Sequence, residues 1–387
     1  MQTTSIRQRS LSALVLLLLL TACSDSTGPV LFAKNNTPVQ LSQWQLMKVN
    51  GSYLELNSEV VAYDLATPLF SDYALKLRTV WLPAGSSAGY TDTGSLDFPV
   101  GTIISKTFYY PVVEGHDSPA AVLRTEQSLA GFSQGQLDLD AVRLIETRLL
   151  VHQADGWQAL PYVWNETQTD ATLEITGAVK RLQLHQSDTV SGEPENFAYV
   201  VPNRNECASC HVLDQNKGDL SPIGPSARNL NRLFAHYPTG AANQLEAWEE
   251  RGWLGDLPPR GQRPIAALWE PGKTDNLENR ARTYLDVNCG HCHQPGGSGD
   301  TSGLFLHAAE TSALALGVCK PPVAAGRGSG GNSYSIVPGH PEQSILSFRI
   351  SSDEVGVLMP EVGRSLTHEQ GSQLINEWIR QQSGDCS

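Results

Sequence analysis

Residues 277–293 read LENRARTYLDVNCGHCH, a helical pattern that runs directly into a Cys-x-x-Cys-His pentapeptide. A second copy of the pentapeptide, CASCH, lies upstream at residues 207–211. This spacing places two thiols over the two vinyl groups of one porphyrin, and the adjacent histidine approaches the iron from one face. The sequence therefore predicts two covalently bound haem c groups, attached through Cys207, Cys210, Cys289 and Cys292, with His211 and His293 as proximal iron ligands.

Zinc or redox sites are the rival interpretation of these four cysteines. A zinc site needs further Cys or His partners at suitable spacing, and none is evident beside either pentapeptide. Chance is a poor explanation, because the chain has only 7 Cys and 10 His in 387 residues. We therefore favour haem over zinc, and we assign no catalytic residue.

The N-terminus has the pattern of an export signal. Two arginines precede an apolar run over residues 11–20, which is too short to span a bilayer. The run leads into LTAC, residues 20–23, which is typical of a bacterial lipoprotein box. We expect residues 1–22 to be removed as a lipoprotein signal peptide and Cys23 to be lipidated; simple secretory cleavage is the alternative. Because Ser24 rather than aspartate follows, we expect an exported, lipid-anchored protein at the outer membrane or in the periplasm.

Two cysteines remain, Cys319 and Cys386, and export makes them a candidate disulfide. Two unpaired thiols are the alternative. The net charge of −13 argues against nucleic acid as a partner. It suits a basic redox partner protein instead.

The composition of the chain changes near residue 202. Before it, alternating apolar residues predict strands, and after it short helices alternate with Gly- and Pro-rich connections. The predicted fold class is α+β multidomain, with an N-terminal antiparallel β-sandwich followed by mainly α-helical cytochrome c-type haem domains. The expected divisions are a signal peptide (1–22), a linker (23–40), the β-sandwich (41–201), a first haem module (202–276) and a second cytochrome c domain (277–387).

Individual elements follow from the same patterns. The expected strands cover 75–82, 102–110, 147–151 and 171–175, and residues 116–141 are expected to form a long loop. In the first strand, two leucines share one face, and Lys76 and Arg78 share the other. The expected helices cover 243–251, 277–287, and a last segment capped by Thr367 that carries Leu374, Ile375 and Trp378 on one face.

The sixth ligand of each iron decides its chemistry. Met359 lies 66 residues after His293, a separation normal for the distal methionine of a small cytochrome c. Thioether ligation raises the reduction potential and leaves no vacant position, which favours electron transfer. The first haem has no such methionine nearby, so its sixth ligand stays open, and an empty position is also allowed. The candidates are Met47, His152, His185, His236, His307 and His340, while His291 is expected to face solvent.

Several short stretches resemble a family of exported bacterial dihaem c-type cytochromes, lipoproteins with an N-terminal β domain. The resemblance covers about residues 41 to 380, and it implies electron transfer without naming a donor. The stretches that carry it are 68–73 (PLFSDY), 98–102 (FPVGT), 146–149 (ETRL), 162–165 (YVWN), 201–203 (VPN), 224–225 (GP), 230–232 (LNR), 288–293 (NCGHCH), 317–322 (GVCKPP) and 337–341 (VPGHP).

Three functional hypotheses follow. The first is a dihaem c-type cytochrome that relays single electrons in the periplasm or at the outer membrane. The alternative is a dihaem oxidoreductase, peroxidase-like or the cytochrome part of a dehydrogenase, in which the first haem is open. In the third, the β domain binds a carbohydrate or polymer; Trp44, Trp81, Trp157 and Trp164 are more simply explained as ordinary core or surface aromatics.

Overall fold

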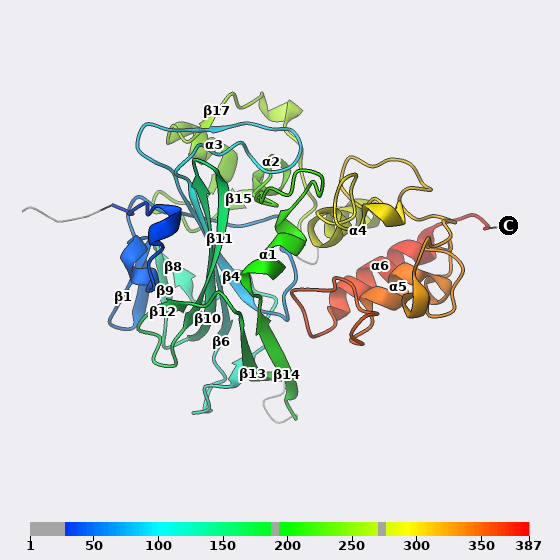
Figure 1. Ribbon diagram of the computed structural model, residues 1–387, viewed down its shortest axis with the longest axis horizontal. Coiled ribbons are helices and arrows are strands. Elements are labelled where there is room, and N and C mark those ends of the chain that lie inside the picture. The colour runs from blue at the N-terminus through cyan, green and yellow to red at the C-terminus, as the bar shows by residue number, and fades with distance from the viewer. Residues whose placement is uncertain (1–27, 187–192, 270–275, 387) are drawn as a thin grey trace, which may run out of the picture.

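The computed structural model describes residues 28–186, 193–269 and 276–386. A β-rich body packs beside a smaller part that holds the last helices of the chain (Figure 1). The predicted signal peptide and lipidated Cys23 lie outside the described residues. No helix in the described ranges is both long and apolar enough to cross a membrane.

The largest sheet has six strands, and every neighbouring pair is antiparallel. The four runs predicted from alternation all supply strands to it, because β-branched, aromatic and leucine side chains fit a pleated surface. In spatial order the strands are β12 (Ala171–Leu173), β11 (Gly156–Trp164), β10 (Val142–Gln153), β6 (Ile103–Pro111), β4 (Leu75–Trp81) and β3 (Val61–Tyr63).

Smaller sheets surround this central one. The four-stranded sheet has the order β1 (Met47–Asn50), β2 (Tyr53–Leu56), β9 (Gln136–Asp138) and β8 (Phe132–Ser133). The three-stranded sheet has the order β14 (Glu195–Val201), β13 (Ala178–His185) and β7 (Ala121–Leu123). Two strand pairs join β15 (Leu233–Phe234) with β16 (Ala242–Asn243), and β17 (Leu254–Gly255) with β5 (Ala88–Gly89).

Residues 116–141 are not the predicted long loop, because they contain β7, β8 and β9. Strands of two or three residues are too short for alternation to reveal.

The helices are short. Within the described residues they are α1 (Arg204–His211), α2 (Ala227–Leu230), α3 (Gln244–Glu250), α4 (Leu277–Leu285), α5 (Ile345–Ile350) and α6 (Glu369–Gln381), together with the π-helix η4 (Asp286–Gly290). The 3-10 turns are η1 (Lys34–Asn36), η2 (Leu41–Trp44), η3 (Arg260–Gln262), η5 (Asp300–Ser302), η6 (Gly326–Ser329) and η7 (Pro341–Gln343).

The predicted fold class, a β-sandwich followed by mainly α-helical haem domains, is wrong. The protein is sheet-rich, with 26% of the described residues in strands and 21% in helices. It forms several sheets rather than a simple pair, and turns fill most of the chain between α1 and α6. The physical reason is that many Gly and Pro residues after residue 202 disfavour continuous helix, so only α6 exceeds ten residues among the described helices.

The faces of α3 and α6 that were expected to be apolar are buried. Leu374, Ile375 and Trp378 of α6 are buried, as are Leu245 and Trp248 of α3. Thr367 is not the N-cap of α6, because that position belongs to His368, which makes no capping hydrogen bond with its side chain.

Two apolar cores matter for the site. The first combines strand residues such as Val80 and Ile104 with Leu230, Leu245 and Trp248, so α2 and α3 pack directly against the largest sheet. The second combines α4, η4, α5 and α6 and includes residues from Ala281 to Ile379. The second Cys-x-x-Cys-His segment contributes Cys289 to the second core, whereas the first lies on α1, which contacts β11 of the largest sheet.

Candidate functional site

The first pentapeptide forms the C-terminal half of α1. The helix begins after Asn203, whose side chain accepts hydrogen bonds from two backbone amides, while the Asn203 amide donates to the Glu206 carboxylate. This capping box fixes where the helix starts. His211 Nδ1 lies 2.8 Å from the carbonyl oxygen of Ser221. Burial lowers the pKa of the His211 imidazole to about 4, so the ring is neutral at physiological pH.

The second pentapeptide follows α4 through η4, where Asn276 caps the start of α4. Its cysteine Cys289 is buried and belongs to the core formed by α4, α5 and α6. His293 Nδ1 lies 3.2 Å from the carbonyl oxygen of Leu304. Burial also lowers the pKa of this imidazole.

The two histidines share one arrangement. In each, Nδ1 contacts a backbone carbonyl about ten residues downstream, and burial favours the neutral ring. A carbonyl partner fixes a proton on Nδ1 and leaves the lone pair on Nε2 for a metal ion. The four neighbouring cysteines are free thiols. Both segments thus present the donor set that covalent haem attachment requires.

The two segments touch, although 82 residues separate Cys207 from Cys289 in the numbering. Cys292 Sγ lies 3.4 Å from the carbonyl oxygen of Ser209, in the middle of the first pentapeptide. The Ser298 hydroxyl donates to the same carbonyl at 3.4 Å. Cys210 and Cys292 share a hydrogen bond that raises the pKa of the Cys210 thiol and lowers that of Cys292. Sequence spacing gives no sign of this contact.

Met359 is half-buried and lies outside the apolar core of the second part. Its amide donates to the carbonyl of Arg349 at 3.1 Å, and its own carbonyl accepts from the Arg364 guanidinium at 2.8 Å. Arg349 is also within electrostatic reach of His293, whose imidazole pKa it lowers. Arg349 therefore links the backbone of Met359 to the surroundings of His293.

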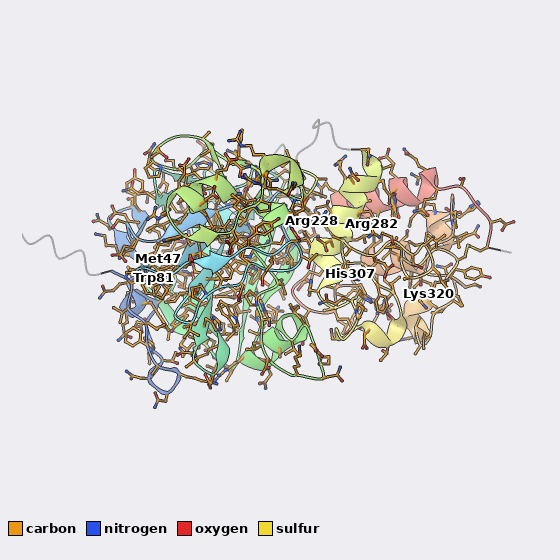
Figure 2. All side chains as sticks on the ribbon, turned by 90° about the horizontal axis from the view of Figure 1, so that it is seen from above. Met47, Trp81, Arg228, Arg282, His307 and Lys320 are labelled. Atoms are coloured by element: carbon orange, nitrogen blue, oxygen red, sulfur yellow. A yellow bond between two sulfur atoms is a disulfide. The ribbon has the colours of Figure 1, made fainter. Side chains whose placement is uncertain are left out.

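The candidate ligands of the first haem have other roles. Met47 is buried in the core, and its sulfur lies 3.9 Å from the Thr107 hydroxyl. His152 stacks on Trp157, His185 packs against His116, and His340 contacts Glu342 at the surface. His236 packs against Phe132 and Phe234. His307 lies against Gly290 of the second pentapeptide, and Figure 2 labels it near Arg228, where the β-rich body meets the smaller part.

His291 does not simply face solvent, as the sequence predicted. Its Nδ1 is buried without a hydrogen-bond partner among the described residues. The ring lies within electrostatic reach of both His211 and His293. The tryptophans Trp44, Trp81 and Trp164 are buried core residues, so they offer no exposed platform for a carbohydrate.

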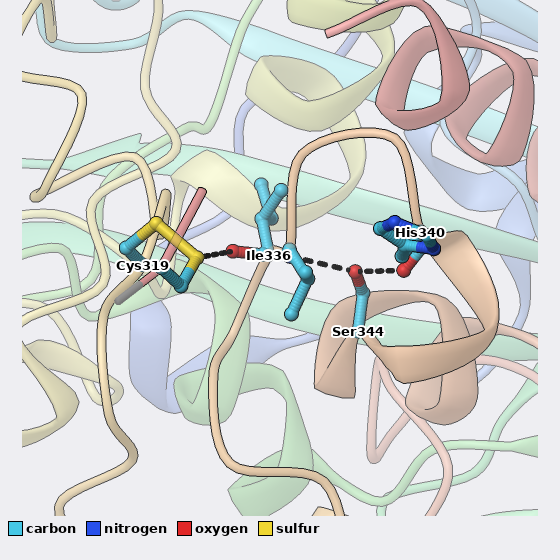
Figure 3. Close-up of a disulfide and its surroundings, with 6 residues drawn as sticks. Cys319, Ile336, His340 and Ser344 are labelled. Carbon is cyan, nitrogen blue, oxygen red and sulfur yellow. Dashed lines mark hydrogen bonds between the residues drawn. A yellow bond between two sulfur atoms is a disulfide. The ribbon is translucent and has the colours of Figure 1, made fainter. Parts of the chain in front are cut away.

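Cys319 and Cys386 form a disulfide with a Cα–Cα distance of 5.1 Å. Cys386 Sγ lies 3.9 Å from the carbonyl oxygen of Ile336, which also accepts from the Cys319 amide (Figure 3). The Ser344 hydroxyl donates to the carbonyl of His340 beside it. The bridge ties the end of the chain to the loop that follows the second pentapeptide.

The stretch 68–73 joins the two parts of the protein. The Phe70 amide donates to Asn288, the residue before Cys289, at 2.8 Å. The Asp72 carboxylate accepts from the amides of Ser365 and Leu366, both at 2.7 Å. Sequence reasoning noted this stretch only for its family resemblance, whereas the structure shows it holding the second segment in place.

Comparison with known proteins adds no identity. No protein-family model, no curated protein and no solved structure matches this chain. Within the described ranges, no three His, Cys, Asp or Glu side chains are grouped to hold a metal ion. A porphyrin supplies four iron ligands itself, so haem needs no such cluster.

Proposed function

We propose that the chain is a dihaem c-type cytochrome that relays single electrons, with one haem c on each Cys-x-x-Cys-His segment. The observation that carries the proposal is the contact between the segments, in which Cys292 Sγ lies 3.4 Å from the carbonyl oxygen of Ser209. Groups attached to touching segments are neighbours, and electron transfer requires such proximity. The resemblance to exported dihaem cytochromes supports the same function.

The residues of this chain have separate roles in that function. The cysteines form the thioether bonds, while Ser221 and Leu304 orient His211 and His293 through Nδ1. Met359 would hold the iron of the second haem on the side away from His293. When bound, haem supplies reversible one-electron chemistry, and the protein tunes its potential through ligands and burial.

The proposed location is the periplasm or the outer membrane, with a lipid anchor on Cys23. At a net charge of −13 the protein suits a basic redox partner protein. The segment at the N-terminus supports export, and the disulfide between Cys319 and Cys386 fits an oxidising compartment.

Haem counting tests the proposal. The full chain is produced in a host with c-type cytochrome maturation, and covalent haem is counted by intact mass and by the pyridine haemochrome spectrum. We expect two haems per chain, and one in each of the paired variants Cys207→Ala/Cys210→Ala and Cys289→Ala/Cys292→Ala. A chain without covalent haem, or with bound zinc instead, would contradict the proposal.

A dihaem oxidoreductase with an open first haem is the second candidate function. The observation in its favour is that Met47 is engaged in the core and so is not free to bind iron. Carbon monoxide binds reduced haem only where the sixth position is vacant or readily yielded. A response from half of the haem would support this candidate, and no response would leave the electron relay.

A further inference from the structure

Three cations lie side by side on the largest sheet. Arg78 of β4 is the antiparallel partner of Lys106 of β6, and Lys106 is the partner of Arg148 of β10. Paired residues of neighbouring strands project from the same face, where like charges repel. We call Arg78, Lys106 and Arg148 the cation row.

The cation row is poorly neutralised. Arg78 is 2% exposed, yet its Nε and Nη2 have no hydrogen-bond partner among the described residues. The Lys106 ammonium forms no hydrogen bond with any described residue, although it lies 5.9 Å from the centre of the Phe108 ring. Arg148 makes a two-point contact with Glu146, and Arg78 Nη1 lies 3.4 Å from Asp64 Oδ1. Buried donors without partners are costly, so the unpaired Nε and Nη2 of Arg78 favour an anion here.

Few carboxylates lie beside the cation row. The Glu146 carboxylate already accepts hydrogen bonds from Arg148 and from the Tyr199 hydroxyl. Among the described residues, the carboxylates within electrostatic reach of the row are Asp64 and Glu146, while Lys76 and Arg232 add further basic groups beside it. Burial and the neighbouring arginines lower the pKa of Lys106 to about 7.

The cation row faces the first haem-attachment segment. Lys106 is within electrostatic reach of Cys210, and Arg148 is within reach of Cys207. Both cations also act on His211. The helix α1 packs against β11, which is a strand of the same sheet as the cation row (Figure 1).

We propose that the cation row is a carboxylate-binding site for the two propionates of the haem attached to Cys207 and Cys210. The inference rests on the proposed function. Guanidinium groups bind carboxylates through paired hydrogen bonds, which suits the free Nε and Nη2 of Arg78. The largest sheet thus acts as one wall of the first haem site.

Lys106→Met in the full haem-loaded chain tests this site. Loss of the cation leaves propionate charge unneutralised, which stabilises the ferric state, so the potential of the first haem falls. We expect about a tenfold shift in its reduction equilibrium, about 59 mV for one electron. The propionate bands of that haem in the resonance Raman spectrum should also move. Lys106→Arg should restore both, and Lys48→Met, which removes a lysine 72% exposed on another sheet, should change neither.

The outcomes separate this inference from the function beneath it. To assign the shift to the first haem, the measurement is repeated in the Cys289→Ala/Cys292→Ala variant, which retains only that haem. Two bound haems with potentials and propionate bands unchanged by Lys106→Met would overturn the carboxylate site alone. So would an equal shift at both haems. A wild-type chain without covalent haem would overturn the proposed function and this inference together.

Discussion

The two Cys-x-x-Cys-His segments share a five-residue pattern but are supported by different parts of the protein. The first lies on the eight-residue α1, next to the strands that carry Lys106 and Arg148. The second follows α4, and its Cys289 belongs to an apolar core built with α5 and α6. The same five-residue pattern therefore lies beside a sheet in one place and in an apolar helical core in the other.

Removing each haem in turn should give the largest difference. Cys289→Ala/Cys292→Ala should destabilise residues 276–386 by about 4 kcal/mol or more, because the core around Cys289 loses its cofactor. Cys207→Ala/Cys210→Ala should leave the β-rich body folded, since its apolar core lies between sheets. Limited proteolysis with mass mapping measures both. Equal protection of residues 276–386 in the two variants would break the comparison.

Opening the disulfide should affect only the second region. Cys319→Ser/Cys386→Ser frees a loop with a sequence separation of 67 residues. Loop entropy predicts a loss of about 4 kcal/mol. Thermal unfolding, followed through haem absorbance, should show an earlier transition for the second haem and an unchanged one for the first. A shared shift would mean that the two regions unfold as one unit.

Replacing the two methionines sharpens the comparison at the irons. Met359→Ala should lower the potential of the second haem by on the order of 100 mV, within the wide range that axial ligands control. Met47→Leu is the matched control, because Met47 packs in the β-rich core, and it should leave both potentials unchanged. A spectroelectrochemical titration reports them. The ligand assignment fails if Met359→Ala leaves the potential of the second haem where it was.

The smallest effect concerns the link between the regions. Burial raises the pKa of the Asp72 carboxyl to about 6, so its folded form favours the proton and loses stability as the pH rises from about 4 through 6. Asp72→Asn keeps an acceptor for the amides of Ser365 and Leu366. Compared with wild type, the free energy of unfolding of Asp72→Asn should rise by about 2 kcal/mol between pH 4 and pH 7.

Denaturant unfolding at several pH values measures that gain. Asp155→Asn is the control of opposite sign, because the hydrogen bond from Lys34 lowers the pKa of that exposed carboxyl. The free energy of unfolding of Asp155→Asn, compared with that of wild type, should not rise with pH. A pH-independent difference for Asp72→Asn would show that the buried carboxyl does not weaken the junction.

Local patterns predicted much of the second region. The run into Cys289, the buried face of α6 and the pairing of Cys319 with Cys386 all depend on residues close in sequence or on cysteine chemistry. The prediction of the fold class was wrong because strands of two or three residues and interrupted helices leave little periodic signal. Their positions depend on tertiary packing instead.

The central features of the site lay beyond sequence patterns. The contact between Ser209 and Cys292 joins segments that are far apart in the chain. Lys76 and Arg78 alternate with leucines as they would on a solvent-facing strand, yet both are buried. Alternation assigns two faces to a strand but does not say what covers the second face.

Electron paramagnetic resonance of the fully oxidised protein tests the central claim, that touching segments hold two neighbouring haems. The spectrum of the wild-type chain is compared with the sum of the spectra of the two single-haem variants. We predict broadened or split wild-type signals that the sum does not reproduce, because neighbouring ferric irons interact magnetically. A wild-type spectrum equal to the sum would contradict the account.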